Sequence, residues 1–211
     1  VRLRPDGSKG MPVLSIAAYE DYQRERAWVW ELQALVRARA VAGDRTLARR
    51  FARTREALLG DARDGDRVRA EIVAMRARWR AGRDRSDAAN FDLKQGLGGL
   101  VDIEFLLQAL VLLHAARHPG LLASGNSAAL IRAAGASNLL GAHDIAVLDA
   151  AHAAFLARAI GCTLDGRPRV AQRDPALDAY AAGVLAVARD AGVPFDAAGT
   201  APPAMVRTGP D

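Results

Sequence analysis

The sequence predicts a mainly α protein in which a helical bundle follows the last strand of a preceding domain. Three observations support this fold class. Apolar residues recur at three- and four-residue spacing from about residue 15 to residue 191. Capping residues precede several of these stretches, and glycines end several of them. Strand-like alternation is confined to the first five residues, with a short strand also possible at 91–94.

Residues 1–14 are expected to be the C-terminal remnant of a domain that lies largely outside this chain. VRLRP alternates like the end of a strand, and PDGSKG reads as a turn or loop. The chain also begins at Val1 rather than at methionine. We therefore expect it to be a piece of a longer protein.

The first helical segment is expected to begin after Ser15 and to stop at Gly43, as one long helix or as two shorter ones with a bend. Asp44 can cap the next helix, which ends near Gly60. The apolar stripes expected to face the core are Trp28, Leu32, Leu35 and Val36 in the first segment, and Leu47, Phe51 and Leu58 in the second.

A further helix places Val68, Ile72, Met75 and Trp79 on one face and ends near Gly82. Residues 83–99 interrupt the helical pattern, and a strongly apolar helix then runs from Leu100 to about His114. Helices are predicted at roughly 127–134, 144–160 and 175–191, the last with Asp174 as N-cap and Pro175 at its first position. The predicted organisation is thus a remnant at 1–14, a helical domain at 15–192 and a flexible tail at 193–211.

Composition narrows the classes of function. With 51% hydrophobic residues among 211, the chain can bury a core. A net charge of +5 permits an anionic ligand but is spread over helices of mixed charge, so we expect no nucleic-acid partner. The single cysteine, Cys162, excludes a disulfide framework and a multi-cysteine zinc site. The apolar run FLLQALVLL is too short to span a bilayer and no secretory leader opens the chain, so we expect no membrane partner and a cytoplasmic location.

The segment FDLKQGLGGLVDIEF, residues 91–105, carries the strongest candidate site. Lysine occurs only at Lys9 and Lys94, and every other basic residue is arginine. A glycine-rich turn at a helix start can offer backbone N–H groups to phosphate oxygens, and a nearby ammonium adds a mobile charge. Asp102 and Glu104 either orient that lysine or simply stabilise the helix N-terminus, and their spacing alone favours the second interpretation by about two to one.

Several ordered motifs resemble one family. VRLRPDGSKG, YEDYQRERAWVWELQALVRARAVAGD and FDLKQGLGGLVDIEF are similar, in order and spacing, to the glutamine synthetase adenylyltransferase family. The similarity covers about residues 1–115 and continues loosely beyond them. WELQALVRAR and FDLKQGLGGLVDIEF look more like its C-terminal, adenylylating half than its adenylyl-removing half.

The resemblance implies a nucleotidyltransferase of the DNA polymerase beta superfamily, so that the bundle follows the last strand of a truncated domain of that kind. Such an enzyme transfers AMP from ATP to a tyrosine of glutamine synthetase, with Mg²⁺ as cofactor and PII signal proteins as regulators. By analogy Lys94, Gly98 and Gly99 face the nucleotide phosphates with Asp102 and Glu104 beside them, and Arg2 and Arg4 lie on the strand next to a metal carboxylate.

The family's metal-binding carboxylates are expected upstream of Val1, so we expect no catalytic and no metal-ligating residue in this chain, and no activity of the chain alone. A non-catalytic helical binding or regulatory module is the alternative.

The other candidate residues are expected to be structural. His114 and His118 are expected at a helix end rather than on a metal, His152 and Cys162 are expected to be partly or wholly packed, and Trp28 is expected in the core. The sequence gives no decision for Trp30 and leaves Lys9 as a loop residue.

Overall fold

α-Helices make up most of the computed structural model, which describes residues 13–197, and this confirms the mainly α class. Two short strands form an antiparallel ribbon in which Phe91 lies opposite Ala171. The helices of the described part are α1 (Ile16–Glu25), α2 (Val29–Val36), α3 (Arg45–Gly60), α4 (Gly65–Ala81), α5 (Leu100–His114), α6 (Ser127–Ala136), α7 (Ala142–Leu164) and α8 (Pro175–Asp190); a 3-10 turn spans Pro119–Leu122, and the strands are β1 (Asn90–Asp92) and β2 (Val170–Gln172).

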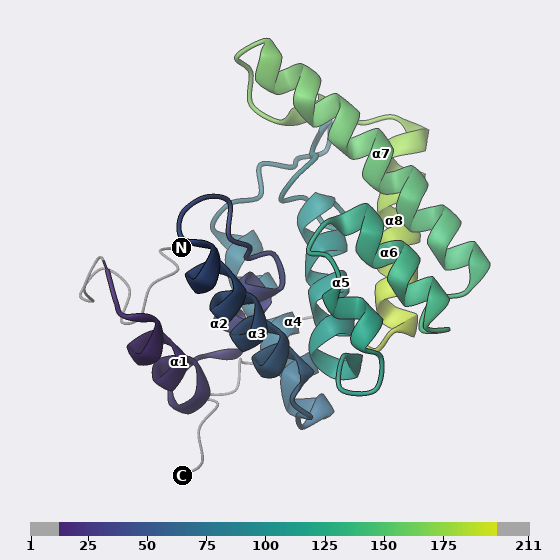
Figure 1. The fold of residues 1–211 in the computed structure, drawn as a ribbon. Coiled ribbons are helices and arrows are strands. Elements are labelled where there is room, and N and C mark those ends of the chain that lie inside the picture. Colours follow the sequence, from purple (N-terminus) through teal and green to yellow (C-terminus); the bar gives the residue numbers. More distant parts are fainter. Residues whose placement is uncertain (1–12, 198–211) are drawn as a thin grey trace.

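Helix α5 lies at the centre of the structure, with α1 to α4 on one side and α6 to α8 on the other (Figure 1). It is apolar on nearly every face, which is the pattern of a helix surrounded by other helices. Its side chains meet those of α2, α4, α6, α7 and α8. The candidate segment of the sequence therefore leads directly into the core helix.

The predicted caps are confirmed. The side chains of Ser15, Asp44 and Asp174 accept hydrogen bonds from the N–H groups of Ala18, Leu47 and Leu177, at 3.2, 2.8 and 2.7 Å. Each bond satisfies a backbone donor that the helix itself leaves free. Pro175 is the first residue of α8, where its missing N–H costs nothing.

The first helical segment is two helices rather than one. It breaks at 26–28, where the Trp28 N–H donates to the Glu31 carboxylate at 2.9 Å and thereby starts α2. Trp28 is only partly buried at this N-cap, so its expected place in the core was wrong, whereas the next residue, Val29, is buried there. Trp30 is partly buried as well.

A buried arginine joins the end of α2 to its neighbours. The Arg55 guanidinium donates to the carbonyls of Leu35, Val36 and Leu122, at 3.1, 2.7 and 3.0 Å. Two of these carbonyls lie at the C-terminus of α2, where a helix lacks internal donors and carries partial negative charge. One side chain of α3 thus holds α2 and the 3-10 turn together.

The structure differs from the prediction at the C-terminal end of the bundle. Val193 and Phe195 are 1% and 2% exposed, and the Phe195 ring lies 6.4 Å from that of Phe105. The Arg80 guanidinium also donates to the Phe195 carbonyl at 2.9 Å. The packed structure therefore continues past residue 192, where we expected a tail to begin; residues 198–211 lie outside the described part.

Helix α7 is longer than predicted, and it is the one helix of residues 13–197 that is long and apolar enough to cross a membrane, with a mean hydropathy of 1.5 in its best window. A packed helix can pass the same test, because length and hydropathy do not report its neighbours. One face of α7, including Leu148, Ala151 and Phe155, is buried against α6 and α8. Leu156, Ile160 and Leu164 are exposed on the remainder.

A prediction concerns Glu20, which joins α1 to α3. Arg50 donates to its carboxylate at 2.7 and 3.0 Å and Thr54 at 2.6 Å, and these bonds lower the pKa of Glu20 from 4.5 to about 2. A lowered pKa in the folded state adds stability above the unfolded value, and this is lost as the pH falls from about 4.5 through about 2.

Replacing Glu20 by Gln should therefore weaken the loss of stability in acid, as measured by urea unfolding at a series of pH values between 2 and 7. The exposed Glu25, also on α1, gives the matched control, Glu25→Gln. Equal acid dependence in the wild type and in Glu20→Gln would contradict the assignment.

Candidate functional site

The chain turns sharply between β1 and α5, and Asp92 organises this turn. Its buried carboxylate accepts hydrogen bonds from the N–H groups of Lys94 and Gln95, at 2.9 and 2.8 Å. The Gly96 N–H donates to the Asp92 carbonyl at 2.8 Å. The backbone on both sides of Lys94 is thus fixed by one residue.

Gly98 and Gly99, predicted to face nucleotide phosphates, are buried against the bundle. Gly98 has a φ of 81°, and a Cβ there would overlap the backbone of Ala181 on α8. Its N–H donates to the Asp102 carboxylate at 2.5 Å, and the Gly99 N–H donates to the Gly96 carbonyl at 2.9 Å. In this structure Gly98 permits a close approach between the turn and α8, whereas a Cβ on Gly99 would crowd the carbonyls of Gly96 and Leu93. Both N–H groups are already bonded within the chain.

The N-terminus of α5 is closed in the same way. The N–H groups of Leu100 and Val101 donate to the carbonyls of Leu93 and Lys94, both at 3.1 Å. The next two donors, at Asp102 and Ile103, bond to the Gly99 carbonyl. A helix N-terminus binds an anion through free N–H groups, and these four are satisfied by the preceding turn.

Asp102 forms a fully buried ion pair with Arg76 of α4, and both side chains are 0% exposed. A second nitrogen of Arg76 donates to the Gln95 carbonyl at 2.7 Å. Burial raises the pKa of Asp102 above its ordinary value, while the Arg76 guanidinium and the Gly98 N–H oppose that rise. This geometry gives Asp102 a structural role in place of the predicted one beside a nucleotide, because its carboxylate is inaccessible.

Glu104 lies two residues further along α5 and pairs with Arg37 at the end of α2. Arg37 is half exposed and Glu104 less so, which makes this a surface contact between two helices. The ion pair uses one carboxylate oxygen of Glu104. A role of Glu104 beside a nucleotide therefore stays a prediction. Arg2 and Arg4, the other predicted contacts, lie outside the described residues, as does Lys9.

Lys94 is the predicted residue that lines a cavity. Together with Arg83, Arg85, Arg167 and Arg169 it surrounds a pocket of about 590 Å³, here called the cationic pocket. The four arginines were missed by the sequence analysis, because they come from two segments about 80 residues apart. The sequence carries no signal for them, because only the pairing of β1 with β2 brings residue 169 to the side of residue 93.

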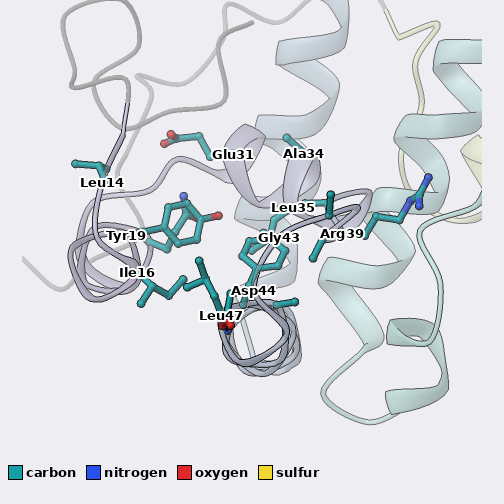
Figure 2. Close-up of a pocket in the computed structure, with 16 residues that line it drawn as sticks. Leu14, Ile16, Tyr19, Glu31, Ala34, Leu35, Arg39, Gly43, Asp44 and Leu47 are labelled. Carbon is teal, nitrogen blue, oxygen red and sulfur yellow. Dashed lines mark hydrogen bonds between the residues drawn. The ribbon is translucent and has the colours of Figure 1, made fainter.

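A second cavity, of about 500 Å³, lies between α1, α2, α3 and the loop at 37–44 (Figure 2). Its lining is mostly apolar. Figure 2 shows Tyr19 beside the cavity with Ile16 and Leu47 below it, and the guanidinium of Arg39 extending away. Burial and the nearby Glu31 carboxylate raise the pKa of Tyr19 to about 12. This α1–α3 cleft is therefore suited to an apolar group rather than to a phosphate.

The remaining candidates behave as structural residues. His114 is the last residue of α5, and Cys162 is buried at 5% exposure with its sulfur 3.9 Å from the Val170 carbonyl. His152 is partly buried on α7. Within residues 13–197, no group of three or more His, Cys, Asp or Glu side chains is arranged to hold a metal ion.

Comparisons with known proteins extend this picture. A family model for glutamate-ammonia ligase adenylyltransferase matches residues 1–54, and one for GlnD PII-uridylyltransferase matches residues 66–160. Among individual relatives, a bifunctional glutamine synthetase adenylyltransferase/adenylyl-removing enzyme from Stenotrophomonas maltophilia (strain K279a) is 49% identical over 92% of this chain. Enzymes of the same name from Xanthomonas campestris pv. campestris (strain B100) and Nitrosococcus oceani are 53% and 44% identical over 83% and 75% of it.

These matches confirm the resemblance to the glutamine synthetase adenylyltransferase family. The similarity reaches well beyond residue 115, because the alignment with the Stenotrophomonas enzyme includes 195 residues. The chain spans about a fifth of the length of these relatives, namely 21%, 19% and 16% of the three.

The glycine turn gives one prediction. Gly98→Ala should destabilise the fold by about 2–5 kcal/mol, because it adds both a strained backbone and an overlap with Ala181. Gly166→Ala is the matched control: its φ is also positive, at 65°, but the space around it is open, so about 1 kcal/mol is expected. Urea unfolding measures both, and equal losses would show that the contact with α8 contributes nothing.

The buried ion pair gives another. Asp102→Asn leaves Arg76 buried beside a neutral partner and should destabilise the protein by about 3–5 kcal/mol. Glu104→Gln, two residues along the same helix, breaks an exposed pair and should cost about 1 kcal/mol or less. Thermal and urea unfolding of the two variants test the difference, and a small loss for Asp102→Asn would mean that the pair does not hold the turn.

Proposed function

We propose that this chain is the helical part of the adenylylating, C-terminal half of a glutamine synthetase adenylyltransferase. The complete enzyme would transfer AMP from ATP to a tyrosine hydroxyl of glutamine synthetase. The observation that carries the proposal is the 49% identity over 92% of the chain to an enzyme named for that activity. Adenylylation also fits a nucleotidyltransferase relationship, since the second matching family model is described as a PII-uridylyltransferase.

The metal chemistry is assigned to another part of the enzyme. Nucleotidyl transfer with two metal ions needs a cluster of carboxylates against the triphosphate, and the described residues do not supply one. We therefore propose that Mg²⁺ is held by carboxylates in the sequence that precedes Val1 in the complete protein. This chain would contribute contacts to the nucleotide and a rigid support for the catalytic part.

The rigidity proposed for this chain rests on the hydrogen bonds and the ion pair around the turn before α5. The turn before α5 is bonded at both ends and pinned by a buried ion pair, so Lys94 is held on a stiff backbone. A preorganised cation contributes more to binding a phosphate than one on a mobile loop, because less freedom is lost on binding.

The partners of the complete enzyme follow from the same proposal. Glutamine synthetase would be the protein substrate, ATP the nucleotide, and a PII protein the regulator, all in the cytoplasm. The names of the relatives support glutamine synthetase as the substrate. PII and the cytoplasmic location are proposed on the resemblance alone.

A binding module without catalysis is the second candidate, and the α1–α3 cleft favours it. A cavity of about 500 Å³ with a mostly apolar lining has the size and character of a site for a small apolar ligand or side chain. A regulatory ligand or a partner side chain bound there would not need the cationic pocket. The two functions can coexist in a multidomain enzyme.

A labelling experiment tests the proposal. The complete protein that contains this sequence is incubated with glutamine synthetase, Mg²⁺ and ATP labelled in the α-phosphate, and so is the 211-residue chain alone. We expect label on a tyrosine of the synthetase with the complete protein only. Absence of label with the complete protein, under conditions where a known relative is active, would contradict the proposed adenylyltransferase function. Labelling by the chain alone would instead contradict the placement of the metal carboxylates outside it.

A further inference from the structure

The cationic pocket is built from three segments that are distant in sequence. Residues 82–85 follow α4, residues 92–95 follow β1, and residues 163–170 connect α7 to β2. The ribbon brings the last two together, since the Leu93 N–H donates to the Arg169 carbonyl at 3.0 Å. The pocket is therefore a product of the fold rather than of one flexible loop.

Its lining is strongly positive. Five of the residues that line it are cationic, and two, Asp84 and Asp92, are acidic. Both carboxylates are engaged by backbone N–H groups: Asp84 accepts from Ser86 at 2.8 Å, and Asp92 accepts from Lys94 and Gln95. Neither carboxylate has an ion pair with a pocket cation among the described residues. Arg167 pairs with Asp165 outside the lining, and the other four cations have no ion pair within residues 13–197, so their charge is available to a ligand.

Three of these cations are held in place by neighbours. The Arg83 guanidinium lies 4.7 Å from the centre of the Trp79 ring, the Arg169 Nε donates to the Thr163 hydroxyl at 3.2 Å, and Arg167 pairs with Asp165 at 2.7 Å. The side chains of Lys94 and Arg85 have no ion pair or hydrogen bond within residues 13–197. Two cations with free donors beside three supported ones form an arrangement suited to an anion with several oxygens.

We propose that the cationic pocket binds the polyphosphate group of a nucleotide, with Lys94 and Arg85 as its direct contacts. The choice of polyphosphate over other anions rests on the proposed function. The pocket volume of about 590 Å³ lies in the range of small-molecule sites, about 300–1,000 Å³, and exceeds the space that a single phosphate needs. Multiple charges also favour a diphosphate or triphosphate over a monophosphate, because each added charge meets another cation.

Binding to the 211-residue chain tests the pocket without any need for catalysis. Isothermal titration with pyrophosphate, ATP and AMP, without metal, should show pyrophosphate and ATP binding with similar affinity and AMP at least ~10-fold more weakly. Raising the salt from 50 to 500 mM should weaken both tight ligands, because the contacts are ionic and partly exposed. Tighter binding of ATP than of pyrophosphate would place the nucleoside in the pocket as well.

Variants connect binding to the named residues. Lys94→Ala and Arg85→Ala should each weaken pyrophosphate binding ~5–20-fold, and Lys94→Arg should recover only part of that loss. Neither change to alanine should lower the melting temperature, because neither cation has a partner to lose within the described residues. Arg53→Ala is the matched control: it removes an exposed arginine of α3 that is not in the pocket lining, and it should leave binding unchanged.

The outcomes separate the pocket from the proposed function. No pyrophosphate binding at 5 mM, or equal affinities for the wild type and Lys94→Ala, would overturn the pocket and leave adenylyl transfer by the complete enzyme untouched. Equal affinity for polyglutamate and pyrophosphate would overturn the polyphosphate assignment in favour of an acidic protein partner. Polyphosphate binding here, together with no labelling of glutamine synthetase, would instead remove the enzyme function and keep the pocket.

Discussion

The buried ion pair between Arg76 and Asp102 is the interaction on which the candidate segment depends. Asp102 receives a charged donor from α4 and a backbone donor from Gly98, while Arg76 also bonds to the Gln95 carbonyl. One pair of side chains thereby ties α4, the turn and the first residues of α5 to each other. Such a pair gains little net stability over apolar packing, because both charges leave water. Its contribution lies in permitting one arrangement of the turn.

This arrangement separates two features that look like one in the sequence. Lysine, glycines and carboxylates within 11 residues suggest a single phosphate site. In the fold, Gly98 packs against α8 and Asp102 is buried against Arg76 of α4, whereas Lys94 lines the cationic pocket. Gly98 and Asp102 fix the backbone of the turn, and the Lys94 ammonium is free to bind an anion. A stiff turn of this kind can present a cation without contributing its own N–H groups.

The fold was largely predictable because helix boundaries and buried helix faces depend on residues that are close together in the sequence. Side chains at Ser15, Asp44 and Asp174 bond to N–H groups three residues away, and the stripes of Val68 with Ile72 and of Leu32 with Leu35 are buried as expected. The errors discussed here arose where contacts with residues distant in the sequence determine the local structure. Val193 and Phe195 look like tail residues until α5 and α4 supply Phe105 and Arg80. Strand β2 is only three residues long and has no pattern of its own; it exists because β1 pairs with it.

The site was harder to predict because charge alone does not reveal which cations are free. The sequence does not distinguish a paired arginine from a free one. Many arginines of residues 13–197 pair with a nearby acid, as Arg50 does with Glu20 and Arg67 does with Glu71. The modest net charge of +5 therefore hides a local excess where the ribbon gathers Arg83, Arg85 and Arg169 around Lys94. At the centre of such a group a lysine differs from a further arginine. A compact ammonium on a flexible stem can follow a polyphosphate among guanidinium groups that are already held, and a planar fork would compete with them for the same oxygens. Lys94, the one lysine of the described residues, thus lies beside three arginines that neighbours hold, namely Arg83, Arg167 and Arg169.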